Sequence, residues 1–162
     1  MTLELPLLQR REVEARILAP VIEALAAKFG RDEVLALLSE TIRQIAREHG
    51  AEIAQSMGSN TMADMAKVLD FWQQDGALEA TVNRHDDEHF DFDVTRCKFA
   101  ELYERLGIRE LGPILSCNRD FCFIEGFNPK IKLQRTQTIM KGASHCDFRF
   151  SSGTEAAPSG SA

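Results

Sequence analysis

The stretch Leu78-Glu-Ala-Thr-Val82, together with Phe90-Asp-Phe-Asp-Val94, decides the fold class of this chain. In both segments apolar residues alternate with polar ones, which is typical of a β-strand with one buried face. The polar run His85-Asp-Asp-Glu88 between them indicates a turn. Residues 77–95 are therefore predicted to form a β-hairpin that buries one of its faces.

The chain before this hairpin is predicted to be helical. In residues 9–29 apolar side chains recur at every fourth position, and Gly30 is a typical helix stop. The stripe consists of Val13, Ile17, Val21, Leu25 and Phe29. Such helices could pack within the domain or against a second subunit, in which case the protein would be a homo-oligomer.

Two more helices are predicted before the hairpin. Residues 32–57 carry apolar side chains at helical spacing, with Gly50 as a weak point. Residues 61–74 begin with Thr61 and Asp64, which form a plausible capping box.

The chain after the hairpin repeats the same order, with two helices and a second hairpin. The helices are predicted at 98–106 and 111–127, and the strands at 131–140 and 145–150. Helices before and between two hairpins indicate the α+β class, in which an antiparallel sheet of two β-hairpins carries helices on one side. The two hairpins could share one four-stranded sheet.

We expect a single domain over residues 1–150. Its helical part covers 1–76, and the part with the sheet and the sequence motifs covers 77–150. The Ser/Gly/Ala/Pro-rich residues 151–162 are predicted to be a disordered tail.

Composition excludes several classes of partner. The 162 residues carry a net charge of −6 and show no basic stripe, which argues against nucleic acids and anionic membrane surfaces. No apolar run approaches the roughly 20 residues that span a bilayer. The N-terminus lacks a secretory pattern, so a cytoplasmic location is expected. The four cysteines are then expected to be reduced, as packing residues, metal ligands or reactive thiols.

Candidate site residues concentrate in the C-terminal third. On the predicted helix 111–127, Asp120 lies three residues after Cys117 and shares its face, whereas Cys122 diverges from Cys117 by about 140°. Arg135 falls on the inward face of the predicted strand 131–140. A buried Asp120–Arg135 ion pair is the simplest interpretation, and a guanidinium that binds a substrate carboxylate is the functional one.

Cys146 alternates with Phe148 and Phe150 and is predicted to face the core. His145 points the other way, so we do not expect it to activate the Cys146 thiol. A metal site built from three thiolates, those of Cys97, Cys117 and Cys146, remains an alternative to a site without a cofactor.

From about residue 93 to 150 the chain resembles the L-2-amino-thiazoline-4-carboxylic acid hydrolase family. The resemblance rests on five short motifs, which are Thr95-Arg-Cys-Lys-Phe-Ala-Glu101, Cys117-Asn-Arg-Asp120, Glu125-Gly-Phe-Asn-Pro129, Arg135-Thr-Gln-Thr138 and Gly142-Ala-Ser-His-Cys-Asp-Phe-Arg149. It implies a hydrolase that opens a small thiazoline-like ring by adding water at the carbon between sulfur and nitrogen. The ending Gly142 to Phe148 is also similar to that of 4-vinyl-reductase-type ligand-binding domains, which bears on the fold only.

The leading hypothesis is a hydrolase of a small cyclic nitrogen-containing carboxylate that opens a thiazoline-like or cyclic-amide ring at a C–N bond. Its predicted catalytic residues are Cys117, Asp120 and Cys146. Arg135, Thr136 and Cys97 are predicted to bind the substrate. Either a thiolate attacks the ring carbon, or Asp120 activates water and the cysteines shape the pocket. The alternative is a small-molecule-binding or sensor domain without catalysis.

Overall fold

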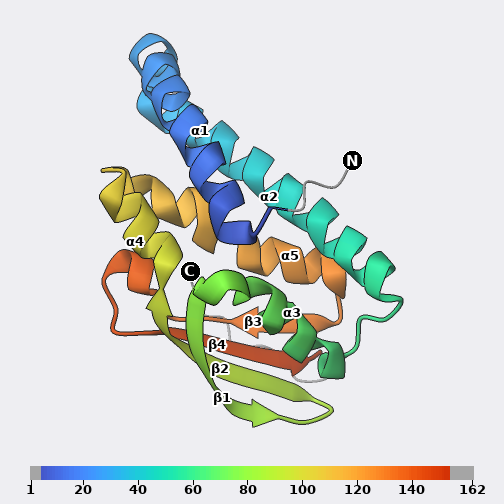
Figure 1. Ribbon diagram of the computed structural model, residues 1–162. Helices are drawn as coiled ribbons and strands as arrows, with labels where there is room; N and C mark the ends of the chain where they lie inside the picture. Colours follow the sequence, from blue (N-terminus) through green and yellow to red (C-terminus); the bar gives the residue numbers. More distant parts are fainter. Residues whose placement is uncertain (1–4, 154–162) are drawn as a thin grey trace.

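The fold is a four-stranded antiparallel sheet with its helices on one side, as a computed structural model shows (Figure 1). The structure describes residues 5–153. The long helices α1 (Leu7–Phe29) and α2 (Arg31–Met57) form a hairpin above the sheet. The shorter helices are α3 (Met65–Trp72), α4 (Lys98–Arg105) and α5 (Arg119–Phe127). The strands are β1 (Leu78–His85), β2 (His89–Cys97), β3 (Ile131–Gln134) and β4 (Cys146–Ser152). This arrangement confirms the predicted α+β class.

The two hairpins share one sheet, in the order β1-β2-β4-β3. Its inner face is an aromatic layer, because the alternating Phe residues of β2 and β4 lie opposite one another in register. Phe92 and Phe148 stack at 4.7 Å between ring centroids, and Trp72 of α3 packs against Phe148 at 6.1 Å. The apolar residues that alternate in the sequence thus form the aromatic face of the sheet against which the helices pack.

Helix α5 crosses α2 at backbone contact, and two glycines make this approach feasible. A Cβ at Gly50 would lie 2.1 Å from Phe123 O, and one at Gly126 would lie 1.9 Å from Arg47 O. Gly50 is therefore the contact point of two helices and not a weak point of one. The motif Glu125-Gly-Phe-Asn-Pro129 gains a structural explanation here, since it contains Gly126 and Glu125, which pairs with Arg47 at 2.7 Å.

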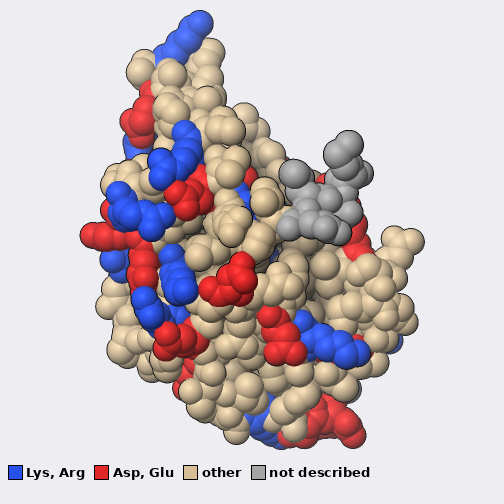
Figure 2. Space-filling view, viewed as in Figure 1, with Lys and Arg blue, Asp and Glu red and all other residues tan. Residues whose placement is uncertain are grey.

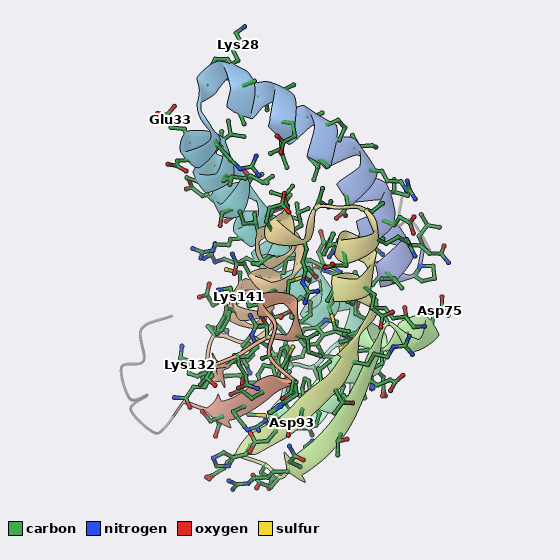
Figure 3. All side chains as sticks on the ribbon, turned by 90° about the vertical axis from the view of Figure 1, so that its left-hand side faces the viewer. Lys28, Glu33, Asp75, Asp93, Lys132 and Lys141 are labelled. Carbon is green, nitrogen blue, oxygen red and sulfur yellow. The ribbon has the colours of Figure 1, made fainter. Side chains whose placement is uncertain are left out.

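The apolar stripe of α1 faces outward. Its members Val13, Ile17, Val21, Leu25 and Phe29 are 41–61% exposed. The buried side of α1 instead carries Leu7, Arg11, Ala15 and Ile22. The α1–α2 hairpin projects beyond the sheet, with Lys28 and Glu33 at its far end (Figures 1 and 3). Figure 2 shows much of its near surface as uncharged.

The predicted helix 111–127 is broken into two pieces. Residues Pro113–Cys117 form a π-helical turn, in which Asn118 N donates to Pro113 O at 2.9 Å, and α5 begins after it. A π-turn inserts an extra residue and so rotates every later side chain around the axis. For that reason Phe121, which lies four residues after Cys117, is 37% exposed, whereas Arg119 and Phe123 point inward.

The predicted strand 131–140 is correct only as far as Gln134. Beyond it the chain leaves the sheet, because the backbone N–H groups of Thr136 and Gln137 donate to the Asp147 carboxylate. Ile139–Lys141 then forms a short 3-10 helix. The connection between β3 and β4 is therefore a structured loop over residues 135–145.

Three smaller predictions can also be checked. The capping box is present, since Asp64 Oδ2 accepts from Thr61 N at 2.9 Å. Residues 151 and 152, predicted to begin the tail, belong to β4, while residues 154–162 lie outside the described residues. Within residues 5–153, no helix combines the length and the apolar character that crossing a bilayer requires.

Candidate functional site

A cavity lies between the aromatic face of the sheet and the helices above it. Its volume is about 80 Å³, well above the roughly 10–15 Å³ that a cavity needs to hold one water molecule. Apolar walls come from Val94, Phe148, Trp72 and Phe123, among others. Its thiols and charged groups come from α1, from β2 and β4, from the π-turn and the start of α5, and from the loop that follows β3.

Asp120 and Arg135 meet in this cavity, as the sequence predicts. Arg135 Nη1 donates to Asp120 Oδ2 in a very short contact, and Arg135 Nη2 donates to Cys117 O at 3.1 Å. The guanidinium lies 5.0 Å from the Phe121 ring and 5.1 Å from the Phe148 ring, and its side chain is only 6% exposed. Two aromatic faces and a carboxylate therefore fix the plane of this cation.

The Asp120 carboxylate retains 22% of its side-chain surface, and it lines the cavity. Burial raises the pKa of Asp120 above its ordinary value, although Arg135 opposes this effect. A carboxylate with a raised pKa and access to a cavity is suited to accept and return a proton near neutral pH.

Three of the four thiols line the same cavity, namely those of Cys97, Cys117 and Cys146. Burial, followed by the nearby Asp120 carboxylate, raises the pKa of Cys117 to about 12, and burial raises that of Cys97 to about 11. Burial also raises the pKa of Cys146, although Ile139 N donates to its Sγ at 3.2 Å. Arg135 thus does not lower the pKa of Cys117 below its ordinary value, because burial and then the Asp120 carboxylate outweigh its positive charge.

Cys122 and His145 lie apart from these three thiols, as the sequence predicts. Cys122 is buried outside the cavity lining, as its helical angle predicts. His145 contacts Gln137 and Ser144 on the outer face of the sheet, so it cannot activate Cys146. In the part of the chain that the structure describes, no group of three or more His, Cys, Asp or Glu side chains is arranged to hold a metal ion.

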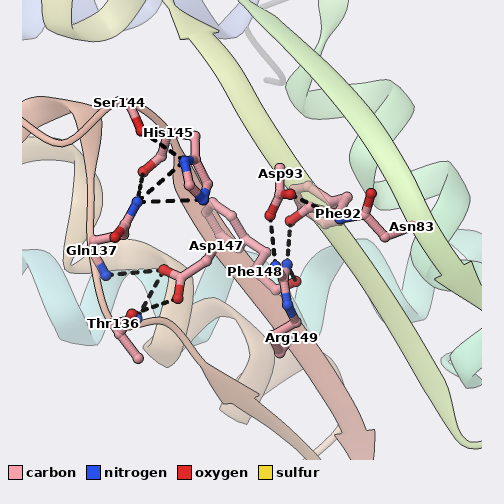
Figure 4. A network of polar contacts seen from close by, with 10 residues as sticks. All are labelled: Asn83, Phe92, Asp93, Thr136, Gln137, Ser144, His145, Asp147, Phe148 and Arg149. Carbon is pink, nitrogen blue, oxygen red and sulfur yellow. Dashed lines mark hydrogen bonds and ion pairs between the residues drawn. The ribbon is translucent and has the colours of Figure 1, made fainter.

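Thr136, predicted to bind substrate, lies outside the cavity lining. It belongs to a polar network on the outer face of the sheet (Figure 4). Asp147 accepts from Thr136 N and Gln137 N, both at 2.9 Å, and from Thr136 Oγ1 at 2.5 Å. These bonds fix the two residues after Arg135. The network on the outer face of the sheet therefore helps to position the arginine, whose side chain lies in the cavity.

Sequence reasoning missed a second group of charged residues at the cavity. Arg11 and Arg119 line it, with side chains only 7% and 11% exposed. Both donate to Glu14, whose Oε2 lies 2.8 Å from Arg11 Nη1 and 3.1 Å from Arg119 Nη2. Arg119 was detectable as part of the Cys117-Asn-Arg-Asp120 motif, whereas Arg11 carries no signal beyond its place between Leu7 and Ala15.

His49 of α2 also lines the cavity. Its ring meets Phe123 edge-on at 5.6 Å between centroids. Burial, followed by the positive charge of Arg11, lowers the pKa of His49 below 6.5. The imidazole is therefore neutral at neutral pH.

Comparison with solved structures finds a similar fold in a sensory domain. The phenol-responsive sensory domain of the transcription activator PoxR, solved with phenol, superposes with a TM-score of 0.51 and 14% sequence identity. The likeness covers 84% of this chain and 73% of that one. At this identity it shows the fold alone.

Comparison of sequences identifies the family. No curated protein matches the chain. The sequence model of L-2-amino-thiazoline-4-carboxylic acid hydrolase, however, matches residues 10–150. The match includes all five motifs and extends through the helical half, where Arg11 and His49 lie. The chain therefore belongs to the L-2-amino-thiazoline-4-carboxylic acid hydrolase family.

Proposed function

We propose that the protein is a hydrolase of a small cyclic nitrogen-containing carboxylate and opens a thiazoline-like or cyclic-amide ring at a C–N bond. The observation that carries this proposal is the Asp120–Arg135 pair at the wall of an otherwise largely apolar cavity. Membership in a family named for such a reaction supports it.

In the proposed reaction Asp120 is the group that moves protons. Its carboxylate takes a proton from a water molecule as the water oxygen adds to the ring carbon bonded to nitrogen. In a cyclic amide that proton returns to the ring nitrogen as the C–N bond breaks. In a thiazoline it returns as the C=N bond becomes single, and Asp120 then carries the proton of the added hydroxyl to the same nitrogen as the carbonyl forms and the C–N bond breaks. Arg135 holds Asp120 in place, and its remaining N–H groups face charge that develops on the adduct.

The cysteines then shape the pocket and are not nucleophiles. Thiol pKa values of about 11 for Cys97 and about 12 for Cys117 leave almost no thiolate at neutral pH. Buried thiols behave as small apolar groups. Of the two chemical versions that the sequence leaves open, the raised pKa values favour activation of water by Asp120.

Two substitutions test this assignment. Cys117→Ser should retain most of the hydrolysis of 2-amino-thiazoline-4-carboxylate, whereas Asp120→Asn should reduce kcat by about 10²-fold or more. Loss of one partner of a buried ion pair also destabilises a fold, by about 3–5 kcal/mol. The double substitution Asp120→Asn/Arg135→Gln removes both charges and serves as a folded control, checked by thermal melting. Inactive Cys117→Ser, or a fully active folded variant at Asp120, would refute the assignment.

A sensor or binding domain without catalysis is the second candidate. The fold likeness to a phenol-responsive sensory domain favours it. It predicts that cyclic amides, hydantoins or thiazolines raise the melting temperature but are recovered unchanged after prolonged incubation. Release of a ring-opened product, detected by mass spectrometry and absent with Asp120→Asn/Arg135→Gln, would exclude it.

We further propose that catalysis needs no cofactor and that the protein acts in the cytoplasm. Metal analysis of anaerobically purified protein tests the first point, and stoichiometric zinc, iron or manganese would contradict it. We also propose that a second copy of the chain covers the exposed stripe of α1, since exposed apolar patches mark interaction sites.

A further inference from the structure

Two buried arginines share one carboxylate at the end of the cavity formed by α1 and the start of α5. Arg11 Nη1 lies 2.9 and 2.8 Å from the two oxygens of Glu14. Arg119 Nη2 reaches Glu14 Oε2 at 3.1 Å, while Arg119 Nε donates to Leu115 O at 2.7 Å. Both arginines line the cavity, whereas Glu14 does not and is 35% exposed. The guanidinium groups are thus nearer to a ligand than their counter-ion is.

The charges at the cavity do not balance. Three guanidinium groups, those of Arg11, Arg119 and Arg135, face two carboxylates, Glu14 and Asp120. One positive charge is left over, and a proton on Asp120 would make the excess two. His49 adds no charge at neutral pH. This excess lies inside a protein whose net charge is −6.

The electrostatic consequence is visible on Arg119. Burial, followed by the like charge of Arg11, lowers its pKa from 12.5 to about 10. An excess buried cation is costly unless an anion pairs with it. A ligand carboxylate would supply that anion, and the planar guanidinium fork is suited to bind it.

Arg135 is the poorer candidate for this role. Its Nη1 is bonded to Asp120 and its Nη2 to the backbone at Cys117. Its guanidinium is also held between two aromatic rings. These partners occupy donors that Arg135 would need for the substrate carboxylate that the sequence assigns to it.

We infer that Arg11 and Arg119 bind the carboxylate of the ligand, so that its ring projects along the apolar walls toward Asp120. The inference rests on the proposed function for the location of the reacting end, but it makes a separate claim about binding. It assigns to the N-terminal helix α1 a part in substrate specificity. The competing explanation is a purely structural role, in which the triad Arg11–Glu14–Arg119 only links α1 to α5.

Binding measurements distinguish the two explanations without any need for turnover. The probes are 2-amino-thiazoline-4-carboxylate and its carboxamide, which keeps the ring and lacks the charge, titrated calorimetrically at low ionic strength. Wild type should bind the acid roughly ten- to hundredfold more tightly than the amide. Arg119→Gln and Arg11→Gln should each abolish this preference, because they should weaken binding of the acid and leave binding of the amide unchanged. Arg16→Gln, which removes an exposed cation from the same helix, should preserve it.

Glu14→Gln provides a test of opposite sign. It removes the competing carboxylate and raises the charge excess, so it should tighten binding of the acid severalfold and leave the amide unchanged. A structural triad predicts no such gain. Should Arg119→Gln fail to fold, Arg119→Lys keeps the charge without the planar fork and should retain only part of the preference.

The outcomes separate this inference from the proposed reaction. An acid-over-amide preference that depends on Arg119, with no ring opened, would support the inference and refute the hydrolase. Equal binding of acid and amide, or a preference unaffected by changes at Arg11, Arg119 and Glu14, would overturn the inference even if the ring is hydrolysed.

Discussion

At the scale of single residues, the site is governed by burial of groups that are normally charged or reactive. Asp120 and the three cavity thiols all have raised pKa values, because removal from water disfavours their anionic forms. The same physics that makes Asp120 a better base makes the cysteines poor nucleophiles. Residue type alone is compatible both with attack by a thiolate and with activation of water by Asp120, so it could not distinguish the two mechanisms.

His49 carries a prediction about pH. Its folded pKa is lowered by burial and by Arg11, so the unfolded state binds more protons as the pH falls through about 6.5. Stability is therefore present above pH 6.5 and is lost as the pH falls toward the folded pKa. Urea denaturation at pH 7.5 and 5.5 should show a larger loss of unfolding free energy in wild type than in His49→Gln. Equal losses would contradict this.

Tyr103 offers a second prediction at this scale. Its ring is fully buried, and its hydroxyl has no hydrogen-bond partner among residues 5–153. Removal of a buried group that makes no bond should cost nothing, because desolvation of that group is already unfavourable. Tyr103→Phe is expected to melt at the wild-type temperature or above it. A drop of several degrees would show that the hydroxyl has a partner in solution.

At the scale of elements, the decisive contact is the crossing of α2 and α5. Gly50→Ala and Gly126→Ala should each lower the unfolding free energy by about 3 kcal/mol or more, because the new methyl group meets backbone atoms that cannot move aside. Gly112→Ala is the matched control. Its methyl group meets only the flexible Met140 side chain, so the expected cost is about 1–2 kcal/mol. Denaturant titration measures all three, and equal costs would contradict the explanation.

The loop between β3 and β4 depends on Asp147. Burial raises its pKa, but hydrogen bonds from Thr136 and Gln137 outweigh burial and hold the pKa below its ordinary value. This stability is present above about pH 3.9 and is lost as the pH falls through the folded pKa. Asp147→Asn should therefore cost about 1–3 kcal/mol at pH 7 and reduce the acid sensitivity. Asp87→Asn, in the exposed β1–β2 turn, should change neither; a similar cost there would argue against a specific role for Asp147.

At the scale of the whole molecule, α1 presents an apolar stripe that the rest of residues 5–153 leaves exposed. If a second copy covers it, multi-angle light scattering should find a dimer for wild type and a monomer for Ile17→Glu. Ala27→Glu changes an exposed residue of α1 two positions from Leu25, on roughly the opposite side of the helix, and should remain dimeric. A wild-type monomer at all concentrations would refute this arrangement.

The sequence by itself determined the alternation of apolar and polar residues, and with it the α+β class and the inward direction of Cys146. These properties are local, since a period of two or 3.6 residues fixes a face without reference to the rest of the chain. The meeting of Asp120 with Arg135 was also predicted, but it does not follow from these periods alone, because Asp120 follows the π-turn and Arg135 follows the end of β3 at Gln134.

Only the tertiary structure decided which of those faces are covered and which charges are balanced. The apolar stripe of α1 is periodic but exposed, because α1 packs against the rest of the domain with its other side, which carries Arg11. The π-turn before α5 rotates Arg119 inward, and the Asp147 network ends β3 at Gln134. Arg11, Glu14 and Arg119 come from segments more than one hundred residues apart, and no local period reports that they meet. The excess of positive charge in the cavity exists only in the folded protein.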